Sequence, residues 1–178
     1  MDHPHLFHLE ASKPKLYDGG SLRKGDEHSF PIVKGNQGCI ASIRLEPGGI
    51  REPHWHPIEW EFDYCVAGTG RMSVVSPDNK LDQFEIKPGD AVFVPQGYFH
   101  YFENIGLDDL HVLLVFNASV ETDIGVTTSL NGVPNAVLAA VFGCPESVFG
   151  AVPRRPEEVI ITRRPVPQPG ANSSTPHG

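Results

Sequence analysis

Short apolar segments separated by turn sequences recur at a regular spacing through the middle of this chain. Between residues 40 and 116 these segments are rich in branched and aromatic side chains, and Pro-Gly, Gly-Thr-Gly and Pro-Asp-Asn sequences separate them. Strands spaced roughly every 8–12 residues, with turn signals between them, are typical of an all-β sandwich or barrel. The predicted strands are Ile40–Leu45, Phe62–Val66, Arg71–Val75, Asp82–Ile86, Ala91–Val94 and Leu110–Phe116.

The regions on either side of these strands differ from them in composition. The first 38 residues are mixed and polar, and they predict an arm with one or two short strands. Downstream, Asn135 at the cap position and Gly143 after the last turn favour a short helix between them, and Pro145 starts another helical turn. The predicted organisation is an N-terminal arm (1–38), a barrel (39–117), a loop and helical segment packed on the barrel (118–163) and a disordered tail (164–178).

Bulk composition narrows the class of protein. With 178 residues the chain is long enough for one domain with a substantial core. Its formal charge of -8 argues against nucleic acid and anionic membranes as partners, and no apolar run approaches the ~18 residues of a membrane-spanning helix. The N-terminus lacks the basic and apolar parts of a secretory signal, so we expect a cytoplasmic protein. Cys39, Cys65 and Cys144 have no CxxC spacing and are expected to be reduced and buried.

Two histidines separated by one residue precede a proline and a carboxylate. In an extended strand, His54 and His56 point to the same face. Glu61 has the wrong parity for an uninterrupted strand, but Pro57 breaks the strand, so the chain can turn and present Glu61 to the same place. His100 has to arrive from a distant strand, which antiparallel pairing allows.

Three imidazoles and one carboxylate are the ligand types that suit Mn(II), Fe(II) or another divalent first-row ion. A structural zinc site would more often contain cysteine and would be closed. Three His and one Glu leave about two open positions on an octahedral ion, which a catalytic metal requires. The alternative is that these histidines are ordinary surface or core residues.

Two longer patterns resemble the sequence motifs of the cupin superfamily. The first is Gly48-x5-His54-x-His56-x4-Glu61-x6-Gly68, and the second is Gly89-x5-Pro95-x-Gly97-x2-His100-x3-Asn104. The resemblance implies a cupin fold, which is a jelly-roll barrel or double-stranded β-helix, with His54, His56, Glu61 and His100 as the metal ligands. It favours Glu61 over Glu59, although simple strand parity places both on one face.

The likeness is greater to one half of the bicupin oxalate decarboxylases, over roughly residues 6–163. It includes the segments 51–57, 70–72 and 123–130. The resemblance implies that Arg51 helps to hold and polarise oxalate, and a guanidinium beside a metal can bind a small carboxylate in bidentate fashion. The alternative for Arg51 is a surface salt bridge with Glu52 or Glu59.

The chain departs from those decarboxylases at the proton relay. In them, a mobile lid after the last barrel strand carries the relay glutamate in a Ser-Glu-Asn-Ser motif, and the other half has a glutamate on that strand. Here the loop 117–125 is shorter and lacks the motif, and Leu114 matches the strand position. Glu121 and Asp123 are the candidate catalytic acids, and solvated loop carboxylates are the alternative. Without a relay, protonation of a carbon intermediate is less efficient.

The leading hypothesis is a metal-dependent enzyme, similar to oxalate decarboxylase, that converts oxalate or a similar small carboxylate into CO2 and formate. The resemblance implies Mn(II) as cofactor, with Fe(II) as the alternative and dioxygen considered as a co-substrate. Oxalate oxidation to CO2 and peroxide, a cupin dioxygenase with a larger substrate, and a non-catalytic small-molecule-binding cupin are the competing functions. Because bicupin halves bury their arms and helices against each other, the resemblance also predicts a homodimer or higher homo-oligomer.

Overall fold

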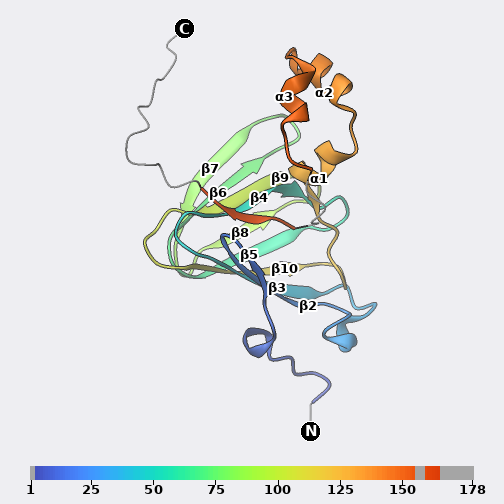
Figure 1. The fold of residues 1–178 in the computed structure, drawn as a ribbon. Helices are drawn as coiled ribbons and strands as arrows, with labels where there is room; N and C mark the ends of the chain where they lie inside the picture. The colour runs from blue at the N-terminus through green and yellow to red at the C-terminus, as the bar shows by residue number, and fades with distance from the viewer. Residues whose placement is uncertain (1–2, 155–158, 165–178) are drawn as a thin grey trace.

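The computed structural model describes residues 3–154 and 159–164, which form a β-barrel with a helical hairpin projecting from one end (Figure 1). One antiparallel sheet has the strand order β1-β2-β3-β10-β5-β8, and the other has the order β11-β4-β9-β6-β7 with β12 paired to β4. The strands are β1 (Lys15–Tyr17), β2 (Gly20–Gly25), β3 (Cys39–Leu45), β4 (Gly49–Trp55), β5 (Glu61–Ala67), β6 (Gly70–Val75), β7 (Leu81–Ile86), β8 (Ala91–Val94), β9 (Phe99–Asn104), β10 (Leu110–Phe116), β11 (Ile124–Gly125) and β12 (Ile161–Arg163). The helices are α1 (Val126–Asn131), α2 (Asn135–Phe142) and α3 (Glu146–Gly150), and the 3-10 turns are η1 (Leu9–Ala11) and η2 (Pro31–Val33).

The predicted all-β class is confirmed, and each of the predicted strands is present in the structure. The expectation that His100 comes from a distant strand is confirmed by β9, although the range of this strand was not predicted. Its inward positions hold His100, Phe102 and Asn104, so its buried face does not have the apolar alternation that identifies a strand in a sequence.

Alternating side chains from both sheets fill the barrel interior. The core includes Leu45, Met72, Phe102, Leu110 and Val112, which are at most 1% exposed. Burying a side chain of this size contributes about 1.5–3 kcal/mol.

The turn between β5 and β6 requires glycine. Gly68 has a φ of +83°, and a Cβ at this position would lie 2.4 Å from the carbonyl oxygen of Asp109. A side chain would therefore be strained by the backbone conformation and would also clash. This is the physical reason for a glycine at the end of the first motif.

The N-terminal segment forms part of the barrel wall. Strand β2 pairs with β3 along its whole length, from Gly20 opposite Leu45 to Gly25 opposite Ile40, and β1 pairs with β2. The turn η1 contributes Glu10, whose carboxylate is 2.8 Å from an Arg44 guanidinium nitrogen. These contacts fix the arm to the outer face of β3 and β10.

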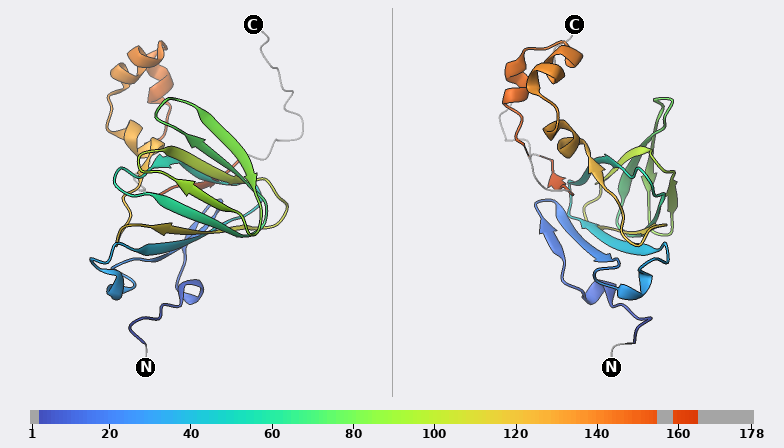
Figure 2. Two further views of the ribbon diagram at one scale, coloured as in Figure 1. Left: turned by 180° about the vertical axis from the view of Figure 1, so that it is seen from behind. Right: turned by 90° about the vertical axis from the view of Figure 1, so that its right-hand side faces the viewer.

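The helical hairpin stands clear of the barrel in both views of Figure 2. The predicted helix over residues 135–142 is confirmed as α2, and α3 begins directly after Pro145. The cap prediction was wrong, because Pro134 occupies the cap position and no side chain caps the helix. Gly143 ends α2 in the left-handed conformation, with a φ of 65°.

Cys39 and Cys65 are buried free thiols, whereas Cys144 is only half-buried.

A buried carboxylate connects the barrel to the chain that follows it. Glu52 accepts hydrogen bonds from the Thr127 hydroxyl at 2.7 Å and from the Ile160 amide at 3.1 Å. The approach is close, since a Cβ on Gly125 would lie 2.5 Å from a Glu52 oxygen. A side chain at this position would displace the Glu52 carboxylate from its present place.

Within residues 3–154 and 159–164, no helix has the length and apolar character needed to cross a membrane. The disorder prediction for residues 164–178 falls, apart from Arg164, outside the described residues.

We predict that the Glu10 contacts stabilise the fold in a pH-dependent way. Burial raises the pKa of Glu10, but hydrogen bonds from Ser42 and Arg44 outweigh this and lower the pKa to about 2. A lowered pKa means that the stabilisation is complete above the ordinary pKa of 4.5 and is lost as the pH falls toward 2. Glu10→Gln should therefore lower the free energy of unfolding by about 1 kcal/mol or less at pH 7, because solvent screens this half-exposed pair.

Urea unfolding of both proteins between pH 7 and pH 3 measures this difference, which should shrink on acidification. Glu85→Gln is the matched control on an exposed strand position. A difference that does not change with pH would contradict the role of Glu10.

Candidate metal centre

A β-bulge in β4 turns Arg51 and His54 toward the same interior. Across the strand pair, Arg51 faces Phe102 and His54 faces His100, so three steps along β4 match two along β9. The extra residue within Glu52–Pro53 reverses the parity that would place Arg51 and His54 on opposite faces. Both side chains are buried, with 2% and 1% of their surface exposed.

The four predicted ligands converge in the barrel. His100 on β9 is the cross-strand partner of His54, and Glu61 begins β5 after the chain has turned at Pro57. The ligand atoms of the four side chains all lie within 4.8 Å of one another, and all four side chains are buried. Glu61 Oε2 lies 2.9 Å from His56 Nε2 and 3.1 Å from His100 Nε2.

Backbone carbonyls orient all three imidazoles. Each ring donates from Nδ1 to a carbonyl oxygen, which leaves Nε2 facing the centre of the cluster. Outer partners of this kind fix the tautomer and direction of metal-binding histidines. The acceptors are the carbonyls of Glu52 for His54 at 2.7 Å, of Thr122 for His56 at 2.7 Å and of Tyr98 for His100 at 2.9 Å.

Neighbouring carboxyl groups in the barrel interior have pKa values shifted in opposite directions. Burial raises the pKa of Glu61, but the nearby His100 and His56 outweigh it and hold the pKa well below the ordinary value. Burial, reinforced by the charge of Glu61, raises the pKa of Asp63 well above its ordinary value. Burial also lowers the pKa of His54. Glu61 is thus ionised and His54 neutral, which are the protonation states that a metal ligand requires. Burial lowers the pKa of His56, but Glu61 outweighs this and raises it.

Among the described residues, Glu61 Oε1 is a buried atom of this cluster without a hydrogen-bond partner, and His56 Nε2 faces only the other oxygen of the Glu61 carboxylate, 2.9 Å away. Buried polar atoms in folded proteins are nearly always paired, and a divalent ion would bind both atoms. The donor set of imidazole nitrogens and one carboxylate suits a first-row ion. The residues present therefore fit a metal.

Glu59, the competing carboxylate, lies outside the cluster and holds the following loop. Its Oε1 accepts a hydrogen bond from the Thr122 amide at 3.1 Å. The carbonyl of the same residue, Thr122, accepts from His56, and Asn117 accepts from the Trp60 amide at 2.9 Å. The loop 117–125 is therefore attached to the chain on both sides of Pro57.

Two ion pairs hold the loop acids next to the cluster. Arg51 pairs with Asp123, and Lys24 pairs with Glu121. The side chains of Glu121 and Asp123 are 6% and 10% exposed, so the alternative of solvated loop carboxylates was wrong. Arg51 is likewise buried, and its contact with Glu52 at 3.8 Å is internal, so the surface salt bridge was also wrong.

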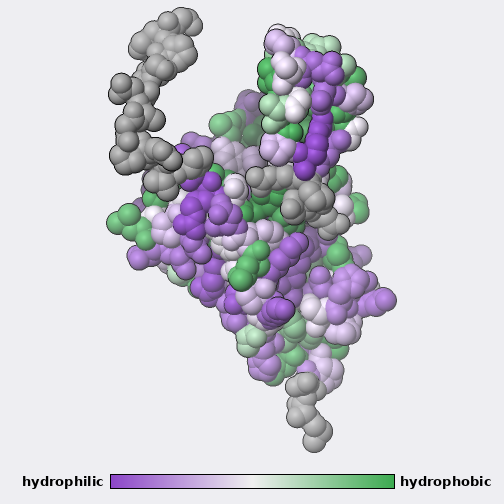
Figure 3. Space-filling view, viewed as in Figure 1, coloured by the Kyte–Doolittle hydropathy of each residue, from purple (hydrophilic) through white to green (hydrophobic). Residues whose placement is uncertain are grey.

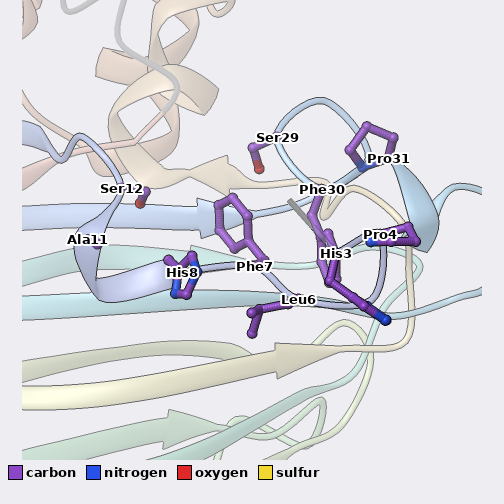
Figure 4. Close-up of a pocket in the computed structure, with 10 residues that line it drawn as sticks. All are labelled: His3, Pro4, Leu6, Phe7, His8, Ala11, Ser12, Ser29, Phe30 and Pro31. Atoms are coloured by element: carbon purple, nitrogen blue, oxygen red, sulfur yellow. The ribbon is translucent and has the colours of Figure 1, made fainter. Parts of the chain in front are cut away.

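These residues line a small cavity next to the cluster. It has a volume of about 20 Å³ and is lined by side chains that include Arg51, Glu121, Asp123 and Leu114. This is room for about one water molecule. A larger groove of about 490 Å³ lies at the N-terminal segment, where Figure 4 shows Phe7 near Phe30, and no cluster residue lines it. Of the two, the smaller cavity is the one lined by His54, His56 and Glu61.

Sequence reasoning missed Lys24 and Asp63. Asp63 is two residues after Glu61 on β5, so strand alternation alone would have placed it in the barrel interior. Lys24 comes from β2, in a region expected to be an arm, and no local pattern connects it to Glu121.

Comparison with known proteins gives the same family for the whole barrel. The Cupin family model matches residues 7–148. The oxalate decarboxylase OxdC of Bacillus subtilis is 32% identical over 142 residues, which are 79% of this chain and 36% of that protein. Germin-like protein 3-7 of Oryza sativa subsp. japonica is 29% identical over 128 residues, which are 70% of this chain and 55% of that protein.

The solved structures agree with the sequences. A single-site mutant of the Bacillus subtilis oxalate decarboxylase superposes with a TM-score of 0.79 at 27% identity, covering 88% of this chain and 41% of that one. This chain thus spans less than half the length of that protein. With the family pattern matched over most of its residues and the barrel reproduced in space, the chain belongs to the cupin family.

Proposed function

We propose that this protein is a metal-dependent enzyme that acts on oxalate or a similar small carboxylate and releases CO2 and formate. The observation that carries the proposal is Arg51, a buried cation in the same cavity as His54, His56 and Glu61. A guanidinium beside a metal cluster provides a bidentate site for one carboxylate group. The similarity to oxalate decarboxylases supports the same substrate class.

His54, His56, Glu61 and His100 would hold the ion, with Mn(II) favoured and Fe(II) as the alternative. One of the similar structures is described by its Mn(II) centers. When bound, such an ion supplies Lewis-acid and one-electron chemistry to a substrate carboxylate. The carbonyl-oriented imidazoles keep the ligand atoms in place, and Arg51 orients the substrate against them.

Asp123 is the better candidate of the two loop acids for the proton relay. Its Oδ2 pairs with Arg51, while its Oδ1 is buried without a hydrogen-bond partner. Both oxygens of Glu121 have contacts, one with Lys24 and one with the Cys39 thiol at 3.9 Å. A carboxyl group with a free oxygen in the cavity can give or take a proton at the reacting carbon.

Oxidation of oxalate to CO2 and peroxide is the second candidate function. Leu114, a buried apolar residue, occupies the β10 position in the cavity lining, so no carboxylate from this strand reaches the site. If Asp123 stays paired with Arg51, proton delivery to carbon slows and oxidation competes. The similarity to germin-like proteins also leaves a non-catalytic binding role as a competing class.

We predict that the purified protein carries one divalent ion per chain and, loaded with Mn(II), forms formate from oxalate with little peroxide. His100→Ala should weaken metal binding by more than about 100-fold, since loss of an outer partner alone can reach that size. Metal analysis with paired formate and peroxide assays measures both. His5→Ala, at an exposed position, is the control. Metal-loaded protein that yields neither product would exclude oxalate turnover and leave the metal centre standing.

We predict that Asp123→Asn slows formate formation by about 100-fold or more without weakening oxalate binding. Removing Arg51 alone would leave a buried charge, at about 3–5 kcal/mol, so the companion variant is the double substitution R51Q/D123N. The variant R51Q/D123N should lose oxalate affinity in addition to formate formation. Steady-state kinetics separate the two effects in kcat and KM.

Asp82→Asn, on exposed β7, is the charge-matched control for these variants. If Asp123→Asn keeps its formate rate while Glu121→Gln loses it, Glu121 is the relay.

The outward face of β5, β8 and β10 supports a homodimer, as the family likeness predicts. Its outward positions expose apolar side chains, with 40% of Phe62, 45% of Tyr64 and 54% of Phe93 accessible. In the helical hairpin Val141 and Phe142 are exposed, and Figure 3 shows green atoms among purple ones on this hairpin. Contiguous apolar surface of this kind marks protein–protein contacts.

We predict a mass of twice the 19.5 kDa chain by light scattering. Phe93→Lys should shift the mass to that of a single chain, because it buries a charge in the proposed contact. Leu107→Lys, at a fully exposed turn position, should leave the dimer intact. A single-chain mass for the unmodified protein would contradict the proposal.

A further inference from the structure

A second groove, of about 440 Å³, lies beside the candidate metal centre and is lined by basic residues of the N-terminal segment. Its volume falls in the range of small-molecule sites, about 300–1,000 Å³. The cations in its lining are Lys13, Lys15, Arg23 and Lys24, and the one carboxylate in that lining is Asp26. Asp26 Oδ1 is already engaged by the amides of His28 and Ser29 in its own turn. On a chain with a net charge of -8, this is a local concentration of positive charge.

The groove and the metal cavity share a wall. Leu22, Lys24 and Val159 line both of them. Leu22 and Val159 are buried side chains, each 6% exposed. Lys24 is the charged member of this wall, so a ligand that leaves the groove for the cavity has to pass it.

Unpaired donors line or border the groove. Tyr17 Oη and Arg23 Nη1 are buried atoms without a hydrogen-bond partner among the described residues. Arg23 is held in place by its Nε, which donates to the Ser12 carbonyl at 3.1 Å. A buried donor without a partner is rare in a folded protein, and an anionic ligand would satisfy both of these atoms.

The Lys24–Glu121 ion pair lies between the groove and the metal cavity, because Lys24 lines both spaces. Glu121 belongs to the loop 117–125. Its carboxylate pairs with Lys24, the cation that lines both the groove and the cavity. The Asp123 carboxylate pairs with Arg51 in the same way. Each loop acid thus fills a place that a substrate carboxylate would take, and the cavity of about 20 Å³ is too small for a dicarboxylate until they move.

We infer that the basic groove is the entrance through which a small dicarboxylate reaches the metal cavity, and that Lys24 binds the carboxylate that does not contact Arg51. The ligand is a dianion because two cations face the path, each with an internal carboxylate to be displaced. This inference rests on the proposed function, since it names the route and charge of the same substrate class. Lys24 is a specificity-determining residue and supplies no metal ligand.

The test measures binding by calorimetry on Mn(II)-loaded protein, with malonate as the dicarboxylate probe and acetate as the monocarboxylate. Malonate should bind more tightly than acetate. The double substitution K13Q/K15Q should lower the malonate association rate, measured by stopped flow, about tenfold at low salt, and the difference should shrink as salt is added. The substitution K80Q/K87Q removes the same charge from exposed lysines elsewhere and should leave the association rate unchanged.

Glu121→Gln tests the displacement directly. It removes the internal competitor for Lys24, so malonate should bind more tightly while acetate is unaffected. Adding Lys24→Met to give K24M/E121Q keeps the closed site neutral and should abolish the preference for malonate. If K24M/E121Q does not fold, the sign of the Glu121→Gln effect decides the question alone.

Equal effects of the two double lysine variants would overturn the inference, because net charge would then explain both. Weaker malonate binding in Glu121→Gln would also overturn it. Malonate binding does not depend on oxalate turnover. If malonate binding changes as expected but oxalate gives no products, the proposed function alone is wrong. If oxalate is turned over but malonate binding does not change as expected, this inference alone is wrong.

Discussion

One extra residue in β4 lets a single strand deliver both a metal-binding imidazole and a guanidinium to the barrel interior. A regular strand would put Arg51 and His54 on opposite faces, because their separation is odd. With the bulge, His54 still meets His100 across the strand pair while Arg51 enters the same cavity. The cluster, its cation and the loop acid that pairs with that cation all depend on this local irregularity.

The loop 117–125 is coupled to the cluster as well as covering it. The carbonyl of Thr122 orients His56, and the amide of Thr122 is held by Glu59. A displacement of Asp123 from Arg51 moves a residue that is adjacent to this double anchor. A loop movement that admits a ligand would therefore also change the orientation of the His56 imidazole. The loop is too short for Asp123 to move without Thr122.

The barrel and the ligand cluster were predictable because their signals are local. Strand alternation, turn glycines and the spacing of His54, His56 and Glu61 are all visible within a few residues. The orientation of Arg51 was not predictable from parity, since a bulge leaves no clear mark in a sequence. The ion pair of Lys24 with Glu121 joins positions 97 residues apart, and only the pairing of β2 with β3 brings them together. The buried state of the loop acids follows from the same long-range contacts.

The N-terminal strands contribute to the site without contributing to the cluster. Lys13, Lys15, Arg23 and Lys24 come from a segment that offers none of the four ligand atoms. Substitutions there would change which molecules are admitted while the imidazoles and Glu61 stayed intact. The N-terminal arm and the four metal ligands are thus two parts of the barrel that can change independently. The metal centre can stay the same while the molecules that reach it differ.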